Sequence, residues 1–254
     1  MSSPRLPAEI LDHVVDHLHG TDEALRNCCL VSKSWIPRSR KHLFADIRLP
    51  TEESLRSWKE TFPDPSISPA RYAKTLSVRY PQVVAAAEAD NWIRGFSRVV
   101  RFTMNSHIDS GERVRSLVPF HGFSPVIKSL HMYIPALPPS RIFNLILSFP
   151  LLENLVVAIR EAWADGDDSP EGDETPTAAQ PPNPTTFAGS LELYLKGGMN
   201  PLAHRLLSLP GGIHFQKLTL TWIRDEDILT TTALMEGCSR TLKFIDITSD
   251  FLGK

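Results

Sequence analysis

The sequence predicts an α+β protein in which three short helices precede an irregular series of strand–helix repeats. Two observations support this prediction. Apolar residues recur at helical spacing near the start of the chain, as Ile10, Leu11, Val14, Val15 and Leu18. From residue 47 onward, pairs of apolar positions separated by one residue return every 25 to 29 residues, with a single longer step. We therefore expect a helical domain over residues 1–49 and a repeat array over residues 50–254.

The helical domain begins at Pro7, which is suited to the first helical position because its missing N–H would be unpaired there anyway. Gly20 is expected to end the first helix, and Thr21 or Asp22 to cap the second. Three helices of this size expose more apolar surface than they can bury among themselves, since about forty residues is near the lower limit for an independent fold. The surplus indicates either a partner protein or a helical cap packed on the following domain.

Three ordered segments carry a resemblance to a known family. They are residues 6–11 (LPAEIL), 22–25 (DEAL) and 30–35 (LVSKSW), continued by residues 36–44 (IPRSRKHLF). In order and spacing they resemble the F-box, in the version common in fungal proteins, over about the first fifth of the chain. Pro37 is the awkward residue of this segment, because a proline this far along is expected to shorten or bend the third helix.

The resemblance implies docking onto a Skp-type adaptor and, through it, onto a cullin of an SCF-type ubiquitin ligase. Trp and Leu anchors on a partner protein are typical carriers of interface energy. By position, the adaptor contacts fall to Leu6, Pro7, Ile10, Leu11, Leu18, Leu25, Leu30, Val31, Trp35 and Leu43.

The repeats after the helical domain have the period of leucine-rich repeats, a solenoid of one strand and one helix per turn. Their first apolar residues are Ile47, Leu76, Phe102, Leu130, Leu155, Leu191, Leu218 and Ile245, with steps of 29, 26, 28, 25, 36, 27 and 27. The usual Asn or Cys of such repeats is missing, because His107 and Arg160 occupy its place in two copies. We therefore expect a degenerate, leucine-rich-repeat-like array, and a generic α/β domain remains the alternative.

Helices are expected between the strands, at 83–96, 141–149, 201–209 and 228–235. Four phenylalanines stand a few residues before a strand and are expected to fill the interior: Phe96, Phe123, Phe149 and Phe215. The long step of 36 contains residues 161–186, with seven acidic residues, five prolines and no Lys or Arg. Such a segment cannot bury enough apolar surface to order itself, so a disordered loop is expected there. Ser169 and Thr175, each followed by proline, are possible phosphorylation sites.

Motifs for chemistry are weak. His13 and His17 have the spacing of a zinc pair, but no further ligand completes the set, so no metal site is expected. We find no phosphate-binding glycine loop and no nucleophile elbow, and we expect no cofactor and no enzymatic activity. The net charge of −2 provides no general attraction to nucleic acid, and no apolar run is long enough to span a membrane. Three cysteines, two of them adjacent, favour a reducing compartment, cytoplasmic or nuclear.

We therefore expect a substrate receptor that docks the adaptor through residues 1–49 and an unknown protein target through the array. A repeat scaffold acting without a ligase and an unrecognised α/β enzyme remain alternatives. The chain stops soon after a repeat without a recognisable polar cap, so a truncated array is a further possibility. Target contacts are expected from outward-pointing strand residues: Ser77, Arg79, Thr103, His131, Tyr133, Glu192, Tyr194, Thr219 and Thr221.

Overall fold

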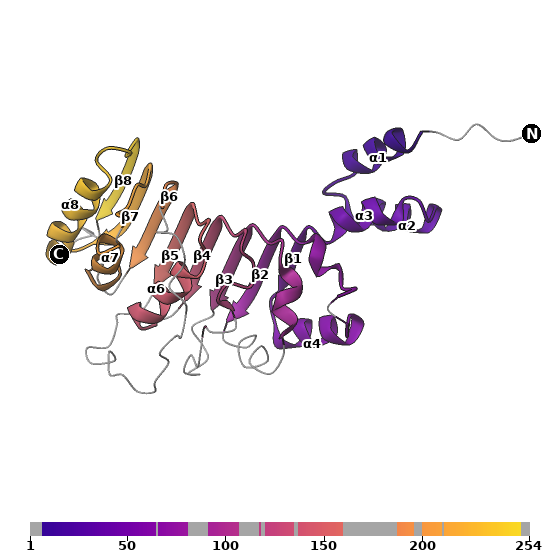
Figure 1. The fold of residues 1–254 in the computed structure, drawn as a ribbon, viewed down its shortest axis with the longest axis horizontal. Helices are drawn as coiled ribbons and strands as arrows, with labels where there is room; N and C mark the ends of the chain where they lie inside the picture. Colours follow the sequence, from indigo (N-terminus) through magenta and orange to yellow (C-terminus); the bar gives the residue numbers. More distant parts are fainter. Residues whose placement is uncertain are drawn as a thin grey trace, which may run out of the picture.

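The computed structural model shows a mixed α/β protein built on one parallel sheet. It describes residues 7–64, 66–80, 91–106, 117, 120–134, 137–159, 187–195, 200–209 and 211–249. The eight strands follow one another across the sheet in the order of the sequence. Figure 1 shows the strands side by side, with helices along one side of the row and the N-terminal helices beyond its first strand.

Each strand contains the alternating apolar pair that the repeat pattern predicts. The strands are β1 (Asp46–Leu49), β2 (Thr75–Tyr80), β3 (Arg101–Ser106), β4 (Ser129–Ile134), β5 (Asn154–Ile159), β6 (Ser190–Leu195), β7 (Lys217–Ile223) and β8 (Phe244–Ser249). All seven neighbouring pairs are parallel, and the eight apolar residues aligned from the sequence are direct register partners from Ile47 to Ile245. The predicted registration of the strands is confirmed.

The core lies between the sheet and the helices that follow its strands. In β1 to β7 the row that begins at Ile47 and the row that begins at Leu49 are buried. The four phenylalanines predicted to fill the interior are buried too, which confirms that expectation. On β8, by contrast, Ile245 and Ile247 are exposed. The buried rows of β1 to β7 form the apolar layer between the sheet and its helices, and removing this apolar surface from water stabilises the fold.

The helices of the array only partly match the expected ones. They are α4 (Glu52–Thr61), α6 (Pro139–Leu147), α7 (Asn200–Leu207) and α8 (Ile228–Gly237). The last three confirm the expected segments within a few residues. The segment expected at 83–96 lies partly outside the described residues, and its described part, Asn91–Phe96, is a 3-10 helix. Helix α4 was not expected, although Thr51 and Ser54 form a reciprocal capping box at its start.

Three helices precede the sheet, α1 (Ala8–His17), α2 (Asp22–Val31) and α3 (Ile36–Leu43). Pro37 lies in the first turn of α3, so it starts this helix and does not bend it, contrary to the expectation. The boundary expected after residue 49 also needs correction. Strand β1 pairs with β2, and Ile47 and Leu49 belong to the core of the sheet. The sheet therefore begins at Asp46, inside the range assigned to the helical domain.

Backbone carbonyls at the start of the strands form a ladder along the sheet. Ala45 O accepts hydrogen bonds from the N–H groups of both Lys74 and Thr75, at 2.8 and 2.9 Å. The same double acceptance recurs at Lys74, Val100, Lys128, Gly189 and Gln216. These bonds pair backbone groups at the start of the strands and tie each strand to the next one.

Candidate functional site

Apolar side chains are exposed on the first two helices. Leu30 and Val31, at the end of α2, are 85% and 69% exposed, and Ile10 and Val14 on α1 are each about half exposed. Scattered exposed apolar residues are ordinary on protein surfaces, whereas two exposed apolar pairs on a short helical unit, each on a helix that packs on α3, are typical of an interaction site. We call Ile10, Val14, Leu30 and Val31 the apolar surface of the helical unit.

The residues expected to contact an adaptor do not all lie on this surface. Pro7, Ile10, Leu30 and Val31 are exposed, whereas Leu11, Leu18, Trp35 and Leu43 are half-buried. Leu25 is 1% exposed, so its assignment as a contact needs correction: it packs inside the helical unit together with Val15. Leu6 lies outside the described residues. Val14 was not assigned a contact, although its place one turn after Ile10 puts it on the same helix face.

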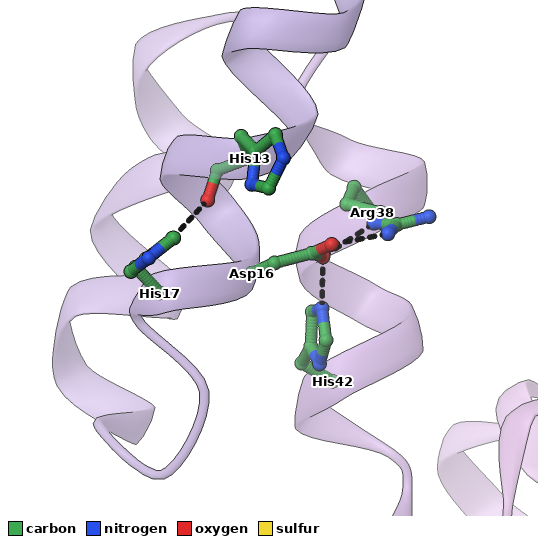
Figure 2. A network of polar contacts seen from close by, with 5 residues as sticks. All are labelled: His13, Asp16, His17, Arg38 and His42. Atoms are coloured by element: carbon green, nitrogen blue, oxygen red, sulfur yellow. Dashed lines mark hydrogen bonds and ion pairs between the residues drawn. The ribbon is translucent and has the colours of Figure 1, made fainter.

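A polar network holds α1 against α3 (Figure 2). The Asp16 carboxylate accepts hydrogen bonds from Arg38, with Nε to Oδ1 at 2.6 Å, and pairs with Arg38 through Oδ2 as well. His42 Nε2 lies 2.7 Å from the same Oδ1. The hydrogen bond from Arg38, followed by the contact with His42, lowers the pKa of Asp16 below its ordinary value. Two-point binding of a guanidinium also fixes the angle between the two helices.

The pKa shift predicts that Asp16 supports the docking of α1 only while it is ionised. The folded-state pKa is depressed, so the contribution is complete above the ordinary pKa of about 4 and is lost as the pH falls below it. We expect Asp16→Asn to weaken the contact between α1 and α3 at neutral pH, and hydrogen exchange in α1 to become faster as a result. Glu9→Gln, at an exposed position of the same helix, is the matched control. Equal exchange in the two variants would contradict this role of Asp16.

The sheet carries a second candidate surface on the face opposite its buried rows, which we call the open face. Most residues expected to contact a target lie there with partly accessible side chains: Ser77, Arg79, Thr103, His131, Tyr133, Glu192, Tyr194 and Thr221. Thr219 is the exception, because it is 8% exposed and its hydroxyl has no hydrogen-bond partner among the described residues. Its assignment as an accessible contact is therefore corrected.

The open face contains a connected polar group around β6. Lys217 Nζ lies 2.9 Å from Glu192 Oε1, and the hydroxyl of Tyr194 donates to Glu192 Oε2 at 3.4 Å. Burial, and then the charge of Glu192, raise the pKa of Tyr194, so the phenol remains protonated and can donate. The charge of Lys217 therefore offsets that of the Glu192 carboxylate, which presents little free charge to a ligand.

His131 lies at the middle of the open face, with its Nε2 2.9 Å from the Ser129 hydroxyl. Burial of the ring, followed by the positive charge of Arg101, lowers the pKa of His131, which favours the neutral imidazole near pH 7. A neutral His beside a Ser has the residue types of a catalytic nucleophile and its base, but the arrangement here is different. Both residues lie on one strand, and neither contacts a described carboxylate that would orient the ring.

In the described part of the chain, no group of three or more His, Cys, Asp or Glu is placed to hold a metal ion. His13 and His17, the pair with zinc-like spacing, are linked instead by a hydrogen bond from the His17 ring to the His13 carbonyl, at 2.8 Å. Cys28, Cys29 and Cys238 are free thiols. The acidic segment 161–186, with Ser169 and Thr175, lies outside the described residues.

Comparison with known proteins gives no relative. No family model matches the sequence, and neither the curated proteins nor the solved structures contain a significant match. Within the described residues, no helix has the length and apolar character needed to cross a bilayer.

Proposed function

We propose that this chain is a substrate receptor of an SCF-type cullin–RING ubiquitin ligase. In this proposal α1–α3 form an F-box that docks a Skp-type adaptor, and the sheet with its helices is an irregular leucine-rich-repeat-like solenoid that holds a target protein. The receptor acts by proximity and performs no chemistry itself, since bringing a target to the ligase raises the effective concentration of its lysines there.

The observation that carries the proposal is the apolar surface of the helical unit. Burying one Leu or Val side chain contributes about 1.5–3 kcal/mol, so leaving four such residues in water is costly unless a partner covers them. The residues resemble the F-box in the same segment, which supports a Skp-type adaptor as that partner. A helical cap on the sheet would instead turn this surface toward the core.

Co-expression with a Skp-type adaptor tests the proposal. We expect the full chain and the adaptor to elute together from a sizing column. Leu30→Asp should weaken capture at least tenfold, because a charge would replace an interface anchor. Leu229→Asp is the matched control, since Leu229 is 83% exposed on α8, away from the helical unit.

Equal capture by the Leu30 and Leu229 variants would refute the assigned surface, and no capture by the unmodified chain would refute the adaptor function. Circular dichroism of both variants should match the unmodified chain, because both side chains lie in solvent. The same preparation distinguishes the alternatives: a scaffold that acts without a ligase would not capture the adaptor.

A further inference from the structure

The centre of the open face carries two tyrosines in one register row. Tyr133 on β4 is the partner of Ala158 on β5, which is in turn the partner of Tyr194 on β6. Ala158 is only 8% exposed and Val156, two residues earlier on the same face, only 5%. The flanking side chains therefore cover these small residues, and the two aromatic rings present the contact surface. We call Tyr133, Ala158 and Tyr194 the tyrosine platform.

Positive charge lies on one side of this platform. Arg79 on β2 occupies the same register row as Tyr133, with Asn105 of β3 between them. Arg101 on β3 faces the same way, two same-facing rows nearer the start of the strands, level with Thr75 of β2. Neither guanidinium has an ion-pair partner among the described residues, unlike Arg48, which binds Asp46 at 3.0 Å. On the other side of the platform, Lys217 is paired with Glu192.

The spacing of these groups sets the length of a matching ligand. Neighbouring strands lie about 4.8 Å apart, so three strand spacings separate the Arg79 and Ala158 backbones by roughly 14 Å. An extended peptide advances about 3.4 Å per residue, so about four residues cover this distance. Tyrosine contributes a rigid, amphipathic contact area, and unpaired arginine favours carboxylates.

We propose that the open face binds an extended acidic peptide that crosses the strands, with a carboxylate at Arg79, further acidic residues on the side of Arg101, and an apolar side chain about four residues beyond the first carboxylate, over the tyrosine platform. This inference rests on the proposed function in that the peptide belongs to the target protein. A protein ligand fits better than a nucleic acid, because two arginines that are unpaired among the described residues give this face too little positive charge for a phosphate backbone.

Fluorescence anisotropy with the full chain tests the inference. The probe is a labelled peptide containing Glu-Glu-Ser-Gly-Ser-Leu in a Gly/Ser host, and the comparison peptides replace Glu-Glu by Lys-Lys, or Leu by Ser. We expect the first peptide to bind tightest, and its affinity to fall as salt rises. Arg79→Glu should weaken it at least tenfold and favour the Lys-Lys peptide. Arg101→Glu is a second charge-reversal variant and should weaken binding of the same peptide. Tyr133→Ala should weaken binding of the peptide with Leu more than binding of the peptide with Ser in its place.

Arg240→Glu is the matched control, because it makes the same charge change at an exposed position between α8 and β8. The inference is overturned if this control weakens binding as much as Arg79→Glu, or if the Lys-Lys peptide binds the unmodified chain equally well. It is also overturned if the Glu-Glu peptide does not bind, or if a single-stranded dT20 oligonucleotide binds more tightly. Adaptor capture by the same preparation tests the proposed function separately: capture without peptide binding refutes only this inference.

Discussion

Phe102→Ala is expected to destabilise the protein by about 3–5 kcal/mol, the usual cost of removing a buried phenylalanine. Phe102 is 0% exposed on β3, and its ring lies 5.4 Å from that of Phe120 and 5.0 Å from that of Phe123. The substitution removes both contacts and leaves a cavity beneath the middle of the sheet. Since a typical domain is stable by only about 5–15 kcal/mol, a large fraction of the stability is lost.

Urea denaturation followed by circular dichroism measures this loss. Phe244→Ala is the matched control, because Phe244 starts β8 and is 53% exposed. Its substitution should change the free energy of unfolding by no more than about 0.5 kcal/mol, as is usual at the surface. Comparable losses in the two variants would mean that the interior of the sheet does not depend on the phenylalanine cluster.

The strands could be predicted because one physical requirement recurs in each of them. Strands β1 to β7 each place two alternate apolar side chains under the helices, so the pair returns with the period of one repeat, as at Leu155 and Val157. Connections with weak periodicity were predicted less well. Helix α4 follows β1 directly and has only Leu55 fully buried, so its capping box was a better signal than its apolar pattern.

The candidate surfaces could not be predicted from the sequence pattern alone, because the pattern does not show which side chains the packing leaves exposed. Leu25 belongs to an apolar series in the sequence, yet it turns inward whereas Leu30 turns outward, because the packing of α2 on α3 decides which side of the helix is covered. Likewise, Val156 and Ala158 read as ordinary strand residues. Only the register shows that Ala158 lies between two tyrosines. Whether the apolar surface binds an adaptor remains a prediction.

Gly189→Ala is expected to break the sheet locally between β5 and β6. A Cβ at this position would lie 2.2 Å from the Glu153 carbonyl oxygen and 2.7 Å from its carbon, both backbone atoms that cannot rotate away. That same oxygen accepts the hydrogen bond from Ser190 N–H at 3.0 Å, and Gly189 O accepts from two N–H groups of the next strand. Relief of the clash must therefore displace the carbonyl ladder, at a cost of about 1–3 kcal/mol or more.

Hydrogen exchange measures where the damage lies. We expect Gly189→Ala to speed exchange in β6–β8, while α1–α3 retain their protection, since each strand contacts only its neighbours. Gly237→Ala is the matched control, because its Cβ would meet only side-chain tips of Leu207 and Ile213, at 3.2 Å or more. The tyrosine platform spans the β5–β6 step, so Gly189→Ala should also abolish binding of the acidic peptide and leave adaptor capture intact. Loss of both together would instead mean that the helical unit and the sheet unfold as one.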